Sequence, residues 1–79
     1  MTQEPVLSGF YVLSDPIRLQ IVGLLKDDEL SVDEICARLN TAQPRLSIHL
    51  KALALAGLVT VQQRGRRHYY KLNKDKLNF

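Results

Sequence analysis

Two helical patterns separated by only three residues most constrain what this chain can fold into. Ser31 and Glu34 form the S-x-x-E pattern of a capping box at the start of the first helix. The apolar stripe of that helix follows at helical spacing and comprises Val32, Ile35, Cys36 and Leu39. Asn40 favours the left-handed conformation that ends a helix, and the second helix is expected to begin near Gln43 and Pro44. The segment therefore predicts a helix, a tight turn and a helix.

The second of these helices, expected over residues 43–56, divides its side chains between two faces. On a helical wheel Leu46, Leu50 and Leu53 share one apolar face with Gly57. The opposite side and its flanks carry Gln43, Pro44, Arg45, Ser47, Ile48 and Lys51. In a DNA major groove, polar side chains can hydrogen-bond to base edges and an aliphatic side chain can contact the thymine methyl group. This predicts a recognition helix with Ile48 facing outward, the alternative being a single exposed aliphatic residue of no functional meaning.

The segments before this pair also have helical spacing. One helix is predicted from the apolar residues Val6, Leu7, Phe10 and Leu13. Asp15 is a suitable N-cap and Pro16 a suitable first residue for the next helix, expected over residues 16–26. That helix is apolar on several sides, so it is predicted to form the buried centre of the domain.

After Gly57 the apolar pattern changes to a period of two, which is typical of strands. Val59 and Val61 alternate with polar residues, Gly65 can adopt a turn, and residues 68–72 return. The hairpin turn carries Arg64, Arg66 and Arg67, expected to project toward a DNA backbone or minor groove. The whole sequence predicts an α+β fold, a winged helix-turn-helix of about four helices, a two-stranded β-hairpin wing over 62–68 and a short C-terminal helical stub.

The charges are separated along the chain in a way that favours a polyanionic partner. Residues 1–37 carry two basic and seven acidic residues, a net −5, whereas residues 38–79 carry nine basic and one acidic residue, a net +8. The alternative is a solvated basic surface without a partner. With 79 residues, the chain is expected to form one domain over 1–79.

Other classes of protein are disfavoured by what the sequence lacks. No apolar run approaches the length of a membrane span, and the first residues do not resemble a signal peptide, so a cytoplasmic location is expected. The single cysteine, Cys36, can supply neither an intramolecular disulfide nor paired thiolates for zinc, and it is expected to pack in the core. No nucleophile or phosphate-loop motif is present, so catalytic residues and cofactors are not expected.

Five segments in this order resemble the winged helix-turn-helix repressors of the ArsR/SmtB type. They are "LSDPIRLQIVGLL", "LSVDEICARL", "AQPRLSIHLKAL", "AGLV" and "GRRHYYKLN", and they span the chain from Leu13 to Asn73. The resemblance implies a homodimeric repressor that binds a palindromic operator in double-stranded DNA and is often released by a metal ion. It also places His49 at a frequent family position in the recognition helix.

The metal sites of the family are not expected in this chain. Where family members that sense soft metals have two cysteines in "ELCVC", this chain has "ELSVD", so Ser31 and Asp33 occupy those positions. The family's other site needs Asp and His on a long C-terminal helix, and the chain ends in "NKDKLNF". We therefore expect no metal ligands, and His49 and His68 are interpreted as close to DNA or structural.

The family dimerises through its first and last helices, which gives a predicted dimer interface. Its expected residues are Val6, Leu7, Phe10, Tyr11, Leu13, Leu77 and Phe79. Leu55 is expected to point outward on the helix predicted over residues 43–56 and could mark a further partner surface. The alternative function is therefore a winged-helix protein-interaction module, or a competitor of a longer relative, with only weak DNA binding.

Overall fold

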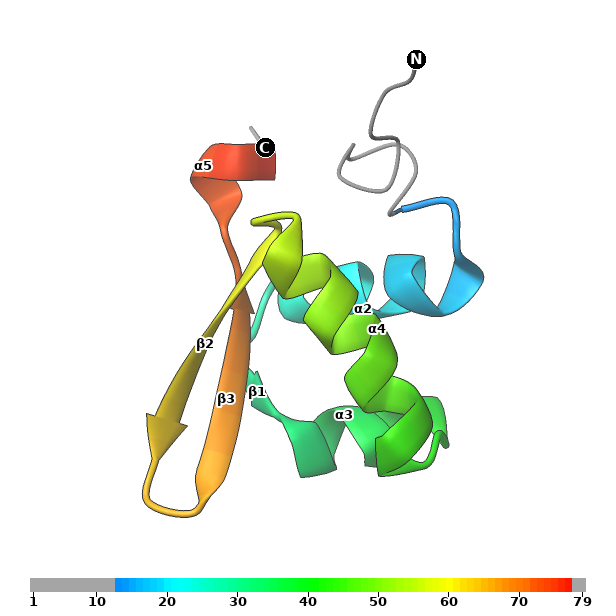
Figure 1. The fold of residues 1–79 in the computed structure, drawn as a ribbon, viewed down its shortest axis with the longest axis vertical. Coiled ribbons are helices and arrows are strands. Elements are labelled where there is room, and N and C mark those ends of the chain that lie inside the picture. The colour runs from blue at the N-terminus through cyan, green and yellow to red at the C-terminus, as the bar shows by residue number, and fades with distance from the viewer. Residues whose placement is uncertain (1–12, 78–79) are drawn as a thin grey trace.

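The structure is a computed structural model that describes residues 13–77, and its helices and strands pack around one core (Figure 1). In chain order the elements are α2 (Pro16–Leu25), β1 (Leu30–Ser31), α3 (Val32–Leu39), α4 (Gln43–Leu55), β2 (Val59–Arg64), β3 (Arg67–Leu72) and α5 (Lys74–Leu77). The predicted helix formed by Val6, Leu7 and Phe10 lies outside the described residues. None of the helices within 13–77 is long and apolar enough to span a bilayer.

Helix α2 begins as its sequence predicts. Asp15 is the N-cap, and its carboxylate accepts hydrogen bonds from the backbone N–H groups of Ile17 at 2.8 Å and Arg18 at 3.3 Å. Pro16 occupies the first turn, where a helix has no use for its missing N–H. The helix buries Ile21, Val22 and Leu25, which confirms its expected central position.

Helix α3 has the predicted signals at both ends. The Ser31 hydroxyl accepts from the backbone N–H of Glu34 at 3.2 Å, and the Glu34 carboxylate accepts from the backbone N–H of Ser31 at 2.8 Å. Asn40 then takes the left-handed conformation with φ 51°, and three residues separate α3 from α4. The predicted helix, tight turn and helix are therefore confirmed.

Helix α4 ends one residue before its predicted boundary, and this corrects the place assigned to Gly57. The expectation put Gly57 on the apolar face of the helix, but Ala56 is the C-cap and Gly57 has φ 79° outside the helix. A left-handed residue is the usual way to end a helix and turn the chain. Here that turn leads to Leu58 and into strand β2.

The sheet has three strands in the order β1-β3-β2, one more than predicted. Strands β2 and β3 form the expected hairpin, with Val59 opposite Leu72 and Arg64 opposite Arg67. The additional strand β1 pairs Leu30 with Tyr70 and Ser31 with Tyr69. The sequence did not predict β1 because two residues are too few to show a period, and because its pairing partner is about 40 positions away.

One apolar core joins the helices to the base of the hairpin. The most deeply buried residues are Ile21, Val22, Leu25, Leu30, Ile35, Leu46, Leu50, Leu53, Ala56, Leu58, Val59 and Leu72. Cys36 is half-buried against this core, as expected for a small apolar side chain. The core thus holds α4 against α2 and α3 and anchors only the end of the wing that lies next to α4.

The capping box predicts a measurable loss of stability when Ser31 is replaced. Ser31→Ala removes the hydroxyl that accepts from the Glu34 amide, and it should lower the free energy of unfolding by about 1 kcal/mol. Urea denaturation followed by circular dichroism measures this change. Ser47→Ala is the control, because Ser47 is exposed in the interior of α4 and alanine is the better helix former there. An equal loss in both variants would contradict the capping role.

The same capping box predicts a pH dependence of stability. The hydrogen bond from the Ser31 backbone N–H holds the pKa of the Glu34 carboxyl below its ordinary value. The unfolded chain therefore binds this proton more readily, so the stabilisation is present above the ordinary pKa and lost as the pH falls through the lowered value. Between about pH 5 and pH 3, the free energy of unfolding should fall more steeply in the wild-type protein than in Glu34→Gln. Parallel pH profiles would contradict this.

Candidate nucleic-acid interface

Helix α4 presents an exposed, mainly polar face opposite its buried leucines. Leu46, Leu50 and Leu53 are buried, and the exposed residues are Gln43, Pro44, Arg45, Ser47, Ile48, Lys51 and Leu55. The side chain of Ile48 faces away from the core, since the residue is 65% exposed. The predicted phase of the helix is therefore confirmed.

The start of α4 differs from the starts of α2 and α3 in having no side-chain cap. Its N-cap is Ala42, which makes no side-chain hydrogen bond to the first amides of the helix. The first turn, to which these amides belong, contains the exposed residues Gln43 and Arg45. Unsatisfied N–H groups at a helix N-terminus favour an anionic acceptor such as a phosphate oxygen.

His49 makes a contact within the protein, although it lies among the exposed residues of α4. Its side chain is only 13% exposed, and its Nδ1 accepts a hydrogen bond from Nε of Arg18 at 3.1 Å. The same Nδ1 lies 4.0 Å from a carboxylate oxygen of Asp15. Of the two roles left open by the sequence, this geometry favours the structural one. Sequence reasoning missed Arg18, because its partner is 31 positions away and no local pattern connects them.

Asp15 forms a cluster with His49 and Arg18, and opposing effects act there on the pKa of its carboxyl. Burial raises the pKa of its carboxyl, but the hydrogen bonds from the amides of Ile17 and Arg18 and the nearby charge of Arg18 together lower it by more, so the net direction is downward. The carboxylate therefore stays ionised while it caps α2. The cluster connects the first turn of α2 to the middle of α4.

The turn of the wing carries two exposed arginines near the start of α4. Gly65 has φ 63° and forms, with Arg66, a two-residue turn between β2 and β3, and both Arg66 and Arg67, the first residue of β3, are exposed. In Figure 1 the wing turn and the N-terminal end of α4 lie at the same end of the molecule. A groove of about 260 Å³ separates them, lined by Ser31, Val32, Asp33, Gln43, Arg66, Arg67 and His68. The structure thus places Arg66 and Arg67 of the wing on the same groove as Gln43, the first residue of α4.

Within residues 13–77, Arg64, unlike Arg66 and Arg67, makes side-chain contacts with other residues of the protein. Its Nη2 donates to both carboxylate oxygens of Glu29 at 2.8 Å, and its guanidinium carbon lies 4.7 Å from the centroid of the Tyr69 ring. Its charge is therefore already paired. Sequence reasoning missed this partner, because Glu29 is 35 positions away and no local pattern connects the two residues.

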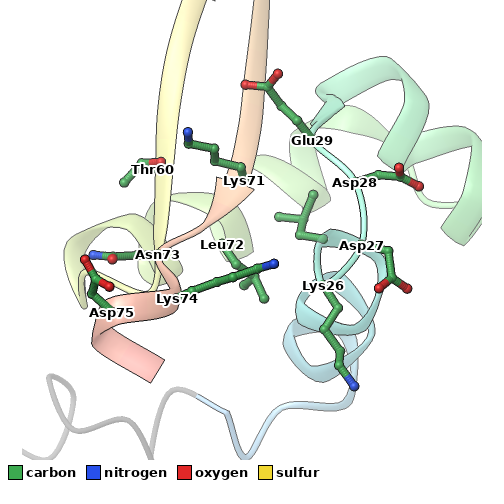
Figure 2. Close-up of a pocket in the computed structure, with 11 residues that line it drawn as sticks. Lys26, Asp27, Asp28, Glu29, Thr60, Lys71, Leu72, Asn73, Lys74 and Asp75 are labelled. Carbon is green, nitrogen blue, oxygen red and sulfur yellow. The ribbon is translucent and has the colours of Figure 1, made fainter. Parts of the chain in front are cut away.

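A larger groove of about 450 Å³ is less suited to a polyanion. It lies between the turn after α2 and the strands, and it is lined by Leu25, Lys26, Asp27, Asp28, Glu29, Thr60, Lys71, Leu72, Asn73, Lys74 and Asp75. Figure 2 shows Lys71 and Lys74 on the sheet and α5, across from the acidic residues 27–29. Because charges of both signs line this groove, it offers no continuous positive surface.

The residues at the positions of the family's cysteines serve other purposes. Ser31 is the N-cap of α3, and Asp33 is exposed on its first turn. Burial, with the nearby charge of Asp33, raises the pKa of the Cys36 thiol, which disfavours the thiolate that a metal would need. Within residues 13–77, no three His, Cys, Asp or Glu side chains are grouped so that they could hold a metal ion.

Most of the predicted dimer interface lies beyond the part of the chain that the structure describes. This applies to Val6, Leu7, Phe10, Tyr11 and Phe79, whereas Leu77 is the last residue of α5. Leu13 is half-buried against the protein's own core. Leu55 is 74% exposed, as its phase on α4 predicts.

Comparisons with known proteins agree with this geometry. The sequence profile described as bacterial regulatory protein, arsR family, matches residues 15–61. The arsenical resistance operon repressor of Staphylococcus xylosus is 41% identical over 79 residues, which cover 100% of this chain and 76% of that protein. The transcriptional repressor SdpR of Bacillus subtilis is 32% identical over 74 residues, covering 89% of this chain and 82% of that protein.

A solved structure with the same fold belongs to a protein that is a homodimer. It is the homodimeric winged helix-turn-helix DNA-binding domain, residues 1–100, of a Mycobacterium bovis protein. The TM-score is 0.82 at 31% identity, and the match covers 94% of this chain and 67% of that chain. The winged helix-turn-helix fold predicted from the sequence is confirmed.

Proposed function

The chain belongs to the arsR family of bacterial regulatory proteins, and on this premise we propose that it is a transcriptional repressor that binds double-stranded operator DNA as a homodimer. The observation that carries the proposal is the single surface formed by the exposed face of α4 and the arginines of the wing turn. Relatives named as transcriptional repressors support this function over a protein-interaction module. The proposal includes a single domain over 1–79, a cytoplasmic location and no catalytic activity.

In the proposed complex α4 occupies the major groove and the wing contacts the backbone or the minor groove. Gln43, Arg45 and Ser47 supply donors and acceptors toward base edges, and Ile48 supplies an apolar contact. Pro44 and Lys51 border this surface, and Arg66 and Arg67 neutralise phosphates. A two-fold dimer presents two such helices about 34 Å apart, one to each half of a palindrome.

The most direct experiment measures binding of the protein to DNA from upstream of its own gene. In a gel-shift assay, the upstream duplex should be bound in the presence of excess unrelated duplex, with an affinity that falls as salt rises. Equal affinity for an unrelated duplex of the same length would contradict operator binding.

The wing arginines are predicted to contact phosphates and not to distinguish bases. Arg66→Ala or Arg67→Ala should weaken binding to every duplex alike and lower the slope of log affinity against log salt by about 1, since one phosphate contact is lost. Fluorescence anisotropy over a salt series measures this slope. Lys74→Ala removes the same charge beside the larger groove and should leave the slope unchanged. A loss confined to one operator base pair would show that the arginine reads sequence.

Ile48 is predicted to contact a thymine methyl group in the operator. Ile48→Ala should leave stability almost unchanged, because the side chain is exposed and alanine favours the helix. Operator binding should weaken by about 1 kcal/mol, with non-specific binding unchanged. The difference should vanish on a duplex with uracil in place of the contacted thymine, because uracil lacks the methyl group.

Leu55→Ala is the matched control for Ile48, since it removes an exposed aliphatic side chain from the far end of the same helix. Operator affinity should be the same as in the wild-type protein. If Ile48→Ala also binds operator and unrelated DNA as the wild type does, Ile48 does not contribute to recognition.

A further inference from the structure

The outer part of the wing has little contact with the core of the domain. Residues 60–68 are all exposed, and among the hairpin residues only Val59, Tyr70 and Leu72 join the core or pack against it. An isolated two-stranded hairpin is only marginally stable in water. The position of Arg66 and Arg67 therefore depends on what else holds the hairpin.

Arg64 connects the hairpin to the opposite edge of the sheet. It is the last residue of β2, and its guanidinium lies over the ring of Tyr69 on the central strand β3. Beyond that ring it reaches Glu29, which directly precedes the edge strand β1. Figure 2 shows the Glu29 carboxylate pointing toward the strands. The side chain thus spans the sheet from β2 to the turn before β1.

The contacts of Arg64 satisfy its charge within the protein. Its Nη2 donates to both Glu29 oxygens at 2.8 Å and to Oε1 of Gln62 at 3.0 Å. A planar guanidinium that pairs with a carboxylate and stacks on an aromatic ring is held in one orientation. These hydrogen bonds all come from Nη2, and turning the guanidinium away from the sheet would break them.

We propose that Arg64 and Glu29 are positioning residues that hold the wing for DNA binding, and that Arg64 does not itself contact DNA. This inference rests on the proposed function and identifies what holds the wing in place. Arg66 and Arg67 meet the phosphates, while the Arg64–Glu29 ion pair keeps their turn at a fixed place relative to α4.

The sign of the Glu29→Ala effect separates this proposal from simple electrostatics. Removing a negative charge from a protein that binds a polyanion should tighten binding. If Glu29 positions the wing, Glu29→Ala should instead weaken binding about threefold, since an exposed ion pair contributes modestly. Asp28→Ala is the matched control: it makes the same change of charge at the neighbouring exposed residue, and it should not weaken binding.

The salt dependence identifies the role of Arg64. Arg64→Ala should weaken binding about as much as Glu29→Ala, with the slope against log salt unchanged, because no phosphate contact is lost. The double variant should be no weaker than either single variant, since both remove the same interaction. A slope lowered by about 1 in Arg64→Ala would overturn the proposal and make Arg64 a phosphate contact.

Hydrogen exchange tests the ion pair without DNA. It therefore distinguishes failure of the positioning role from failure of the proposed DNA-binding function. In Glu29→Ala, the backbone amides of β2 and β3 near the turn should exchange faster, while those of α4 should not change. Asp28→Ala should exchange as the wild-type protein does. Unchanged exchange near the turn, or binding that tightens equally in Glu29→Ala and Asp28→Ala, would overturn the positioning role.

Discussion

The burial of Leu46, Leu50 and Leu53 fixes the rotation of α4, and the rest of the candidate interface depends on that rotation. These leucines are at most 1% exposed, and the core they enter includes Ile21 and Ile35. Because a helix has a fixed angle per residue, burying this face turns Arg45, Ser47 and Ile48 outward without any further interaction. The surface that we propose reads DNA is thus a geometric consequence of the core.

Most local features could be predicted from the sequence because each depends on a few adjacent residues. Asp15, Ser31 and Asn40 mark helix ends through contacts with backbone groups close in sequence. The features that were missed join distant segments. Strand β1 pairs with β3 across about 40 positions, Arg18 meets His49, and Arg64 meets Glu29. A charged residue in a sequence has many potential partners, and only the folded chain selects one.

Folding pairs some of the charges that are separated along the chain. The acidic run 27–29 and the basic hairpin belong to different halves of the sequence, yet Glu29 ends beside Arg64. The remaining arginines of the wing turn are left on the surface that also contains Gln43. Counting charges along the sequence therefore overlooks ion pairs within the protein, such as that of Arg64 with Glu29.

Ser31 belongs to two structures at once, since it pairs with Tyr69 in the sheet and also caps α3. With an exposed fraction of only 2%, it leaves little room for the strand and the helix to move apart. The base of the wing is therefore joined to the helix-turn-helix at a buried residue, whereas the outer part of the wing is exposed. In the proposed complex, a duplex that must be bent or twisted to meet both α4 and the wing would carry an elastic cost, even where no side chain touches its bases.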